Sequence, residues 1–429
     1  MKICMFTNTY LPHVGGVANS VSTFASDLLD LGHQVLVVAP EFEGSNNHDS
    51  EDRHVLRLPA IQNFNGSDFS VNLPLPFLIS ERMESFQPEV IHSHHPYLLG
   101  NAGLRTAKQR GIPIVFTHHT LYERYTHYVS ENSEVLKRFA LRLSTEYANL
   151  CTRVVAPSQS VADLITRRGV SRPIDVIPTG VDLPFFGDGQ GRGFRKRYGI
   201  PADALVIGHV GRLAPEKNLA YLAEAATHIL EKRKSACFLV IGSGPSENAI
   251  RDIFNKRGLE DRLFAVGKLS GEPLRDGYHA MDLFVFSSQS ETQGMVLTEA
   301  MAAGLAVVAL DGPGVREVVQ DGFNGRLMPA DTPPEAFAKA ADAWLQTGTT
   351  DDAMTQRIRS SVEPFDRRIC AARMATLYEE AVEQHRSTQP RSKETGPFDR
   401  LLERIKAEWD LIDGAISAAV DTVMEKRNE

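Results

Sequence analysis

The chain is poor in cysteine. Its 429 residues include only four, Cys4, Cys151, Cys237 and Cys370, and no two of them form a Cys-x-x-Cys pair. Sparse, widely separated cysteines exclude a small disulfide-stapled scaffold and favour reduced, buried thiols in an intracellular protein.

Long hydrophobic runs are also missing. No stretch approaches the roughly 18 consecutive apolar residues that a membrane-spanning helix needs. The first residues enter a strand pattern without a signal-peptide cleavage site. We therefore expect a cytoplasmic protein whose membrane contact is at most peripheral, on the inner face of the membrane.

Excess positive charge is absent as well. The formal net charge of −8 disfavours nucleic acid as a partner, because a nucleic-acid-binding surface is basic. No Asp-x-Asp pair occurs anywhere in the sequence, so the usual carboxylate pair for a divalent metal is missing. We expect neither a metal nor a cofactor. With 42% apolar residues, the chain can form two or three domains with substantial cores.

Short apolar strand patterns alternate with helical patterns along most of the sequence, which predicts parallel sheets in an α/β fold. The strands expected in the first half are residues 2–7, 35–39, 90–92, 114–117, 153–156 and 175–177. Those expected in the second half are residues 205–211, 238–242, 263–267, 283–286 and 306–310.

Residues 182–193 are rich in glycine and proline, separate the two series of strands and are expected to form a linker. The predicted domains are residues 1–184 and 198–364, two doubly wound, Rossmann-like domains that face a cleft. Such domains bind ligands at the carboxyl ends of their strands. Polar residues at those strand ends are therefore the candidates for a site.

The segment that ends at Glu299 combines a strand end, a loop and a helix start with two carboxylates. The helix is predicted to begin near Gly294. Its first amide groups, those of Met295 and Val296 among them, then have no intrahelical partner and should attract an anion. Glu291 and Glu299 can accept hydrogen bonds from hydroxyl groups on either side of that anion. A sugar nucleotide, whose diphosphate joins two sugars, has this arrangement.

The loop after the first strand of the second half is basic. Gly211 precedes Arg212, and Pro215 is placed to open a helix that includes Lys217. Arg212 and Lys217 are suited to neutralising a diphosphate through charge-assisted hydrogen bonds of roughly 1.5–3 kcal/mol each. The alternative is a solvated helix start with a salt bridge between Arg212 and Glu216, worth about 0–1 kcal/mol.

Two glycines follow the first strand of the chain. Gly15 and Gly16 let the backbone approach a phosphate or a sugar closely, although paired glycines also make ordinary tight turns. His13 in the same loop is a candidate substrate contact.

Histidines end two further strands of the first half, His92 and His94 at one and His118 and His119 at the other. A zinc site is one interpretation of this pattern, but a substrate cleft explains the same placement. In such a cleft His118 is the preferred candidate for a substrate contact, and His119 is a candidate supporting residue.

Five motifs in this order resemble the retaining glycosyltransferases of family four, which have the GT-B fold. They are Gly15-Gly16-Val17, His118, Gly211-Arg212 with Lys217, Gly242-Ser243-Gly244-Pro245, and Glu-x7-Glu from Glu291 to Glu299 followed by Gly304. The resemblance covers residues 1 to about 385, and the combination is far more specific than any single motif. It also implies a last helix, at about 365–385, that returns to the N-terminal domain.

The resemblance implies roles for individual residues. Donor binding is implied for Gly15, Gly16, Gly211, Gly294, Met295, Val296 and Glu299, with Glu299 on the nucleotide ribose. Catalytic roles are implied for His118, Glu291, Arg212 and Lys217, with Glu291 on the donor sugar and His118 on its reacting edge. The expected donor is UDP-glucose, from which a glucose is transferred.

The expected mechanism follows from charge. Breaking the anomeric bond leaves an oxocarbenium-like sugar and a nucleoside diphosphate with extra negative charge, so positive groups on the leaving group should lower the barrier most. Arg212 and Lys217 can supply that charge in place of a metal. Front-face attack, with the departing phosphate oxygen taking the acceptor proton, would retain the anomeric configuration, as is proposed for the family.

Residues 117–129 resemble the corresponding segment of bacterial diacylglycerol glucosyltransferases, which implies a diacylglycerol-type lipid as acceptor. Within this segment, Tyr122, Tyr125 and Tyr128 are interpreted as an amphipathic lip for the lipid headgroup, or alternatively as a packed, partly wet loop. A soluble sugar or a phosphatidylinositol-type acceptor with the same donor chemistry is left open. Outside the enzymes, a two-domain sugar-binding protein is the alternative.

A polar linker, residues 386–397, leads to a helix pattern over residues 398–427. Apolar residues recur there at alternating spacings of four and three, which is a heptad seam. Five basic and seven acidic residues give this segment a charge of −2, which argues against an anionic membrane as its partner and for another helix. We expect a homodimer formed through this helix.

Deleting residues 390–429 should therefore convert a dimer to a monomer, because the apolar seam that holds the two copies together is removed. Molar mass in solution, measured by light scattering during size exclusion, checks this. An unchanged molar mass would exclude association through the segment.

Overall fold

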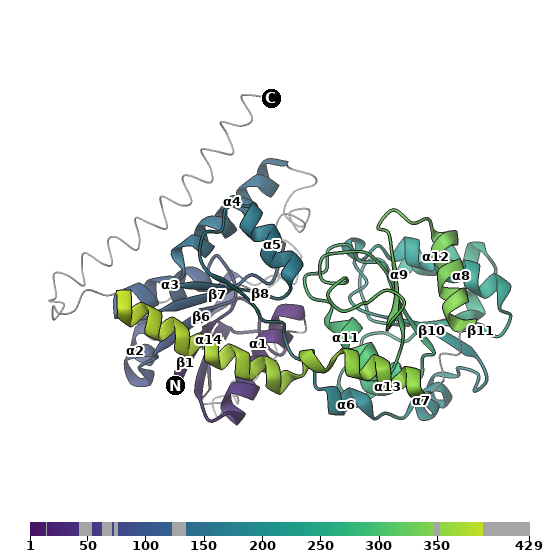
Figure 1. Ribbon diagram of the computed structural model, residues 1–429, viewed down its shortest axis with the longest axis horizontal. Helices are drawn as coiled ribbons and strands as arrows, with labels where there is room; N and C mark the ends of the chain where they lie inside the picture. The colour runs from purple at the N-terminus through teal and green to yellow at the C-terminus, as the bar shows by residue number, and fades with distance from the viewer. Residues whose placement is uncertain are drawn as a thin grey trace. The chain divides into compact units, whose positions relative to one another are not determined.

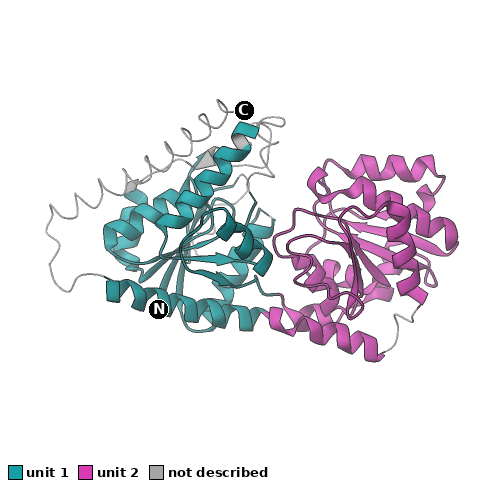
Figure 2. Ribbon diagram, turned by 45° about the horizontal axis from the view of Figure 1, so that its top comes forward, with its two compact units in different colours: residues 1–180, 367–429 teal, residues 181–366 magenta. Residues whose placement is uncertain are grey.

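The computed structural model describes residues 1–13, 15–42, 54–61, 71–72, 76–121, 134–346 and 352–388. The chain forms two compact units, which Figure 2 shows in different colours. Unit 1 comprises Met1–Gly180 and the chain from Arg367 onward, and unit 2 is Val181–Asp366. Each unit is built around a parallel sheet of its own.

The sheet of unit 1 is doubly wound, as the alternating pattern predicts. Its described strands are all parallel and follow the order β3-β2-β1-β6-β7-β8-β9. The strands are β1 Lys2–Phe6, β2 Gln34–Pro40, β3 Val55–Leu58, β6 Val90–Ser93, β7 Ile114–Thr117, β8 Arg153–Ala156 and β9 Ile174–Val176. The sequence pattern did not predict β3, nor the short antiparallel pair β4 Ala60–Ile61 and β5 Val71–Asn72.

Helices cover both faces of this sheet (Figure 1). They are α1 Gly16–Asp30, α2 Pro76–Phe86, α3 Leu99–Arg110, α4 Glu134–Leu150, α5 Gln159–Arg167 and α14 Arg367–Thr388. Alternate residues of β1 enter two separate hydrophobic clusters, Cys4 and Phe6 in one and Ile3 and Met5 in the other. A strand buried on both faces requires this period of two. Among the described residues, no helix is both long and apolar enough to cross a membrane.

Unit 2 repeats the architecture. Its described strands are parallel, in the order β12-β11-β10-β13-β14-β15. They are β10 Leu205–Val210, β11 Ala236–Ile241, β12 Leu263–Ala265, β13 Leu283–Phe286, β14 Val307–Leu310 and β15 Gly325–Met328. The helices are α6 Leu183–Gly187, α7 Gly191–Tyr198, α8 Leu219–Lys232, α9 Glu247–Lys256, α10 Gly271–His279, α11 Met295–Ala302, α12 Pro334–Gln346 and α13 Asp352–Ser361. The two Rossmann-like units confirm the predicted fold class, although β15 was not predicted.

The linker prediction for residues 182–193 is wrong. This segment contains α6 and the start of α7, and it belongs to unit 2, because the chain passes between the units at Gly180 and again at Asp366. Phe186 is buried in the core of unit 2. Gly191 is needed for packing, since a Cβ there would lie 1.9 Å from the carbonyl oxygen of His279. Gly191 therefore brings two stretches of backbone together rather than loosening the chain.

The helix expected at about 365–385 is α14, which begins at Arg367 and packs along α1 (Figure 1). Arg367 forms an ion pair with the buried carboxylate of Asp27 on α1. Further along, Cys370, Met374 and Tyr378 are buried in one of the two clusters of unit 1. The last described helix of the chain therefore completes the core around its first strand.

The two glycines of α7 offer a matched test of this packing. Gly191→Ala should lower the free energy of unfolding of unit 2 by roughly 2–3 kcal/mol, because the new methyl group meets backbone that cannot yield. Gly193→Ala should raise it by about 0.5–1 kcal/mol, since a Cβ there is at ordinary contact distance and alanine favours helix. Urea denaturation of both variants checks the prediction, and equal effects would contradict it.

Candidate functional site

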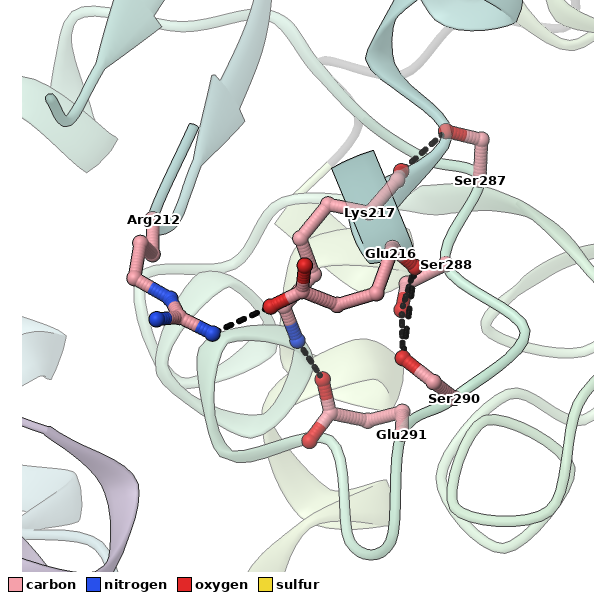
Figure 3. A network of polar contacts seen from close by, with 7 residues as sticks. All are labelled: Arg212, Glu216, Lys217, Ser287, Ser288, Ser290 and Glu291. Atoms are coloured by element: carbon pink, nitrogen blue, oxygen red, sulfur yellow. Dashed lines mark hydrogen bonds and ion pairs between the residues drawn. The ribbon is translucent and has the colours of Figure 1, made fainter. Parts of the chain in front are cut away.

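The candidate site of unit 2 lies at the carboxyl ends of β10 and β13. These strands are neighbours in the centre of the sheet, and β10 lies where the strand order reverses. Loops diverge at such a point, so a doubly wound sheet leaves room for a ligand there. Arg212 and Lys217 follow β10, and Glu291 follows β13 (Figure 3). The strand order thus brings together residues more than seventy positions apart.

The loop after β10 packs tightly against the loop after β11. The Leu213 amide donates a hydrogen bond to the Ser243 carbonyl at 2.9 Å, and the Ser246 amide donates to the Leu213 carbonyl at 2.8 Å. A Cβ at Gly242 would lie 1.9 Å from the carbonyl oxygen of Gly211. The glycines of the Gly242-Ser243-Gly244 motif therefore let the two loops touch, which fixes the start of the basic loop.

Serine hydroxyls hold the basic turn from the other side. The Ser287 hydroxyl donates to the carbonyls of Lys217 and Asn218, each at 3.0 Å, and the Ser290 hydroxyl donates to the carbonyl of Glu216 at 3.2 Å. A third hydroxyl, that of Ser288, also lies within bonding distance of the turn and of Ser290 (Figure 3). No role was predicted for these serines, although three hydroxyls within four residues of a strand end were a visible signal.

Two ion pairs line the turn. Lys217 Nζ lies 2.8 Å from Glu291 Oε2, and these side chains are 17% and 19% exposed. Arg212 pairs with Glu216, as in the alternative interpretation of the sequence, but Glu216 is only 6% exposed whereas Arg212 is 49% exposed. The Arg212 guanidinium group is thus held by the buried carboxylate of Glu216 and remains about half exposed to solvent.

The Lys217 pair determines the ionisation of Glu291. Burial alone would raise the pKa of Glu291, but the charge and hydrogen bond of Lys217, together with hydrogen bonds from the amides of Gly294 and Thr292, outweigh burial and hold the pKa below its ordinary value. Glu291 is therefore an ionised carboxylate at neutral pH, able to accept hydrogen bonds only.

Helix α11 begins where the sequence predicts. Gly294 precedes it with a φ of 82°, a left-handed conformation that favours glycine. The first intrahelical bonds are those from Leu297 and Thr298 to the Gly294 carbonyl, at 2.9 and 3.2 Å. The amides of Met295 and Val296 come before these bonds, at the positive end of the helix.

Glu299, the second glutamate of the motif, lies further along α11. The hydroxyl of the fully buried Tyr278 donates a hydrogen bond to Glu299 Oε2 at 2.6 Å. Burial raises the pKa of Glu299 to about 7, and the hydrogen bond from Tyr278 opposes that rise. The two glutamates of the motif thus differ in ionisation. Lys217 and the backbone amides outweigh the effect of burial at Glu291, whereas the Tyr278 hydroxyl does not outweigh it at Glu299.

The remaining predicted residues lie in unit 1. Gly15 caps α1, and its carbonyl accepts the Asn19 amide at 2.9 Å. A Cβ at Gly16 would meet nothing within 4 Å. The His13 ring stacks on Phe42. His118 is buried after β7 and donates its amide to the Val155 carbonyl. The predicted acceptor contacts Tyr122, Tyr125 and Tyr128, and the predicted helix at 398–427, lie outside the described residues.

Three further histidines at the strand ends of unit 1, His92, His94 and His119, make buried or part-buried hydrogen bonds. His92 bonds the Tyr378 hydroxyl at 2.6 Å and the Thr117 hydroxyl at 2.7 Å, and His94 bonds His119 at 2.9 Å. Burial lowers the pKa of His92 to about 3, so its ring is neutral. Across the described ranges, no three His, Cys, Asp or Glu side chains are grouped so as to hold a metal ion. The zinc interpretation has no support in this part of the chain.

Comparison with known families decides the identity. Residues 14–185 match the protein family described as "Glycosyltransferase Family 4", and residues 192–361 match the family described as "Glycosyl transferases group 1". The chain belongs to the family-four glycosyltransferases. This glycosyltransferase is a hexosyltransferase, and the match favours an enzyme over the two-domain sugar-binding protein.

Curated relatives of this glycosyltransferase are named for different substrates. An alpha-monoglucosyldiacylglycerol synthase of Acholeplasma laidlawii is 27% identical over 90% of this chain and 98% of its own length. A GDP-mannose-dependent alpha-mannosyltransferase of Corynebacterium glutamicum is 28% identical, over 80% of each chain. A D-inositol 3-phosphate glycosyltransferase of Thermobispora bispora is 28% identical over 70% of this chain and 73% of its own.

Solved structures share the fold. Anabaena HepE in complex with UDP has a TM-score of 0.70 at 19% identity and covers 89% of this chain and 100% of its own. Sucrose-phosphate synthase from Thermosynechococcus elongatus has a TM-score of 0.72 at 20% identity, with 88% and 98% covered. The GT-B fold expected from the motifs is confirmed.

The raised pKa of Glu299 has a measurable consequence for stability. Because the folded pKa is about 7, against an ordinary value of 4.5, the stability that Glu299 contributes is present below pH 4.5 and is lost as the pH rises through 7. Glu299→Gln removes the ionisation. Its stability relative to the natural protein should therefore improve by on the order of 2 kcal/mol between pH 5 and pH 8.

Urea denaturation at the two pH values checks this expectation. Glu260→Gln, at an exposed position of the same unit, is the matched control. A stability difference between Glu299→Gln and the natural protein that stays constant from pH 5 to pH 8 would show that Glu299 does not titrate in this range.

Proposed function

We propose that this glycosyltransferase transfers glucose from UDP-glucose to a diacylglycerol-type lipid, with retention of the anomeric configuration and without a metal. The proposal rests on three features that follow β10 and β13. They are the Lys217–Glu291 ion pair, the half-exposed Arg212 and the first turn of α11. Cations, helix-start amides and an ionised carboxylate are the partners that a diphosphate and a sugar need.

The donor diphosphate would bind the two cations. Lys217 and Arg212 each bond a carboxylate, but a diphosphate carries more charge and offers more acceptor oxygens, so it competes for both. A guanidinium has five N–H donors, so Arg212 can keep Glu216 while it donates to phosphate. Glu291, ionised at neutral pH, would then accept hydrogen bonds from hydroxyls of the donor sugar.

The nucleotide half would extend along α11. Met295 and Val296 would donate their amides to the diphosphate, and Gly211 and Gly294 would keep the backbone close to it. Glu299, on the same helix, would accept the vicinal hydroxyls of the ribose.

The chemistry would rest on the leaving group. As the anomeric bond breaks, negative charge grows on the phosphate oxygen, and Arg212 and Lys217 would stabilise that charge. The bonds from the Ser287 hydroxyl hold the main chain at Lys217 in place beforehand. Arg212 and Lys217 take the place that a metal ion has in other sugar transferases. The same phosphate oxygen would accept the proton of the attacking hydroxyl on the front face of the sugar, which retains the configuration.

The acceptor side is proposed from the relatives. The alpha-monoglucosyldiacylglycerol synthases support glucose as the sugar and diacylglycerol as the acceptor. Unit 1 would receive the acceptor beside His118, with His13, Tyr122, Tyr125 and Tyr128 as its contacts. A lipid acceptor would bring the enzyme to the membrane surface on its inner face. The mannosyltransferases and inositol phosphate glycosyltransferases are about as similar, so their substrates belong in the test.

The test is a panel of reactions. UDP-glucose, UDP-galactose and GDP-mannose are each incubated with diacylglycerol, phosphatidylinositol, inositol phosphate and a soluble sugar, with and without excess chelator. We expect a glucosylated diacylglycerol by mass spectrometry, an α-anomer by NMR and full activity in chelator. A different lipid or sugar product would correct the substrate, and loss of activity that metal restores would overturn the metal-free mechanism.

Lys217 gives the matched variant for this assay. Lys217→Ala should lower kcat/KM by roughly 10²–10³, because it removes charge that stabilises the leaving group and leaves Glu291 without its cation. Lys256→Ala, an exposed lysine of α9, should leave kcat/KM unchanged. Equal activity of the two variants would mean that Lys217 is not in the donor site.

A further inference from the structure

Tyr278 is a buried phenol that no motif singles out, and it contacts the proposed ribose-binding carboxylate. It lies on α10 and has no exposed surface. Its ring packs edge-on against Phe186, with ring centroids 5.7 Å apart, and at a tilt against Phe284, at 5.9 Å. Its hydroxyl reaches Glu299 Oε2 at 2.6 Å, within the normal range for an O–H···O bond to a carboxylate.

The position of Tyr278 is fixed by the packing of α10 on the sheet. The preceding residue, Gly277, lies so close to β11 that a Cβ there would come within 2.4 Å of Ile241 Cδ1. A residue in such a place can neither turn its ring nor withdraw its hydroxyl without opening the core. Tyr278 is therefore a rigid donor aimed at one oxygen of Glu299.

A glutamate side chain on a helix has three rotatable bonds, and ordering it costs conformational entropy. A hydrogen bond to one carboxylate oxygen selects a single orientation before any ligand binds, which leaves the other oxygen for a second partner. Binding of a ligand to an already ordered group loses less entropy. The Tyr278 contact thus has the geometry of a positioning interaction.

We infer that Tyr278 is a positioning residue of the donor site, whose hydroxyl orients the Glu299 carboxyl group for the ribose hydroxyls. The inference rests on the proposed function, because it takes Glu299 as the ribose contact. It assigns to Tyr278 a role in donor binding and none in the bond-breaking step.

The ionisation of Glu299 depends on few groups. Burial raises its pKa to about 7, and Tyr278 is the group whose hydrogen bond opposes the rise. Helix α11 also packs against α6, α13 and β14. Arg359 of α13 donates to the Gly187 and Ala303 carbonyls beyond the far end of the helix, and Asp182 caps α6. Strand β14 contributes apolar residues only.

Removing the phenol hydroxyl therefore has a predictable sign. Without Tyr278 the carboxyl of Glu299 binds its proton more tightly, so its pKa rises further and a larger fraction is protonated at neutral pH. A protonated carboxyl accepts hydrogen bonds less well than a carboxylate. Donor affinity should fall, and the pH needed to recover it should rise.

The experiment compares Tyr278→Phe with the natural enzyme in donor KM and kcat from pH 6 to pH 9. We expect about a tenfold higher donor KM at pH 7 in Tyr278→Phe, a KM inflection displaced to higher pH, and kcat within about twofold. Tyr221→Phe is the matched control, because Tyr221 of α8 also loses a hydrogen bond, to the Thr332 carbonyl at 2.7 Å, but does not contact Glu299.

Superimposed KM profiles for Tyr278→Phe and the natural enzyme would overturn the inference. So would the same displacement in Tyr221→Phe, since that would reflect stability alone. Glu299→Gln covers the case in which Tyr278→Phe does not fold. It keeps an oxygen for Tyr278 but cannot titrate, so its donor KM should lose the inflection, and an unchanged inflection would contradict the inference.

Calorimetric titration with UDP over the same pH range separates this inference from the proposed function. If the natural protein binds UDP but transfers no sugar, the proposed function fails while the Tyr278 comparison still stands in the binding data. If sugar transfer is found and UDP affinity has the same pH dependence in Tyr278→Phe and the natural protein, the positioning role alone fails.

Discussion

Hydrogen bonds between the serines after β13 and the turn after β10 are the constraint on which the unit 2 site depends. The Ser287 hydroxyl bonds the carbonyls of Lys217 and Asn218, so the main chain of the turn is held independently of its side chains. Neighbouring strands fix the spacing of these loops. Lys217 is thereby held beside Glu291, which follows β13 as the serines do. Because of this ion pair the partly buried carboxylate of Glu291 stays ionised.

The same framework separates two residues of one type. Glu291 and Glu299 stand eight positions apart, yet the pKa of the first lies below its ordinary value and that of the second is about 7. The difference comes from their partners, a lysine ammonium with backbone amides in one case and the Tyr278 phenol in the other. Glu291 is therefore ionised at neutral pH, whereas Glu299 changes its ionisation near neutral pH.

Local patterns in the sequence were sufficient for much of the fold. Central strands carry continuous apolar runs because both faces are buried, and the helix start at Gly294 follows from glycine and helical spacing alone. The edge strands β3 and β15 were not predicted, because an arginine, Arg57 in β3 and Arg326 in β15, interrupts each short apolar run. Residues 182–193 were misread because composition does not distinguish a flexible glycine from one that packs like Gly191.

The candidate site was predictable where a motif carries charge and unpredictable where the role depends on tertiary contacts. Arg212, Lys217 and Glu291 were identified from their type and spacing, and the strand order of unit 2 brings them together. The pairing of Lys217 with Glu291 was not foreseen, since it joins two loops. Tyr278 had no signal at all, because a tyrosine in a helical pattern is ordinarily core and its hydrogen-bond partner is set by the fold.

The discontinuity of unit 1 has a consequence for how the polypeptide is made. Unit 2 is one uninterrupted stretch, Val181–Asp366, whereas the core around β1 includes Met374 and Tyr378 from the far end of the chain. A ribosome that has released the protein only as far as Asp366 has supplied everything unit 2 needs, while the earlier-made half still exposes the apolar face that α14 covers. Most of unit 1 is thus translated before unit 2, yet its core is completed after that of unit 2.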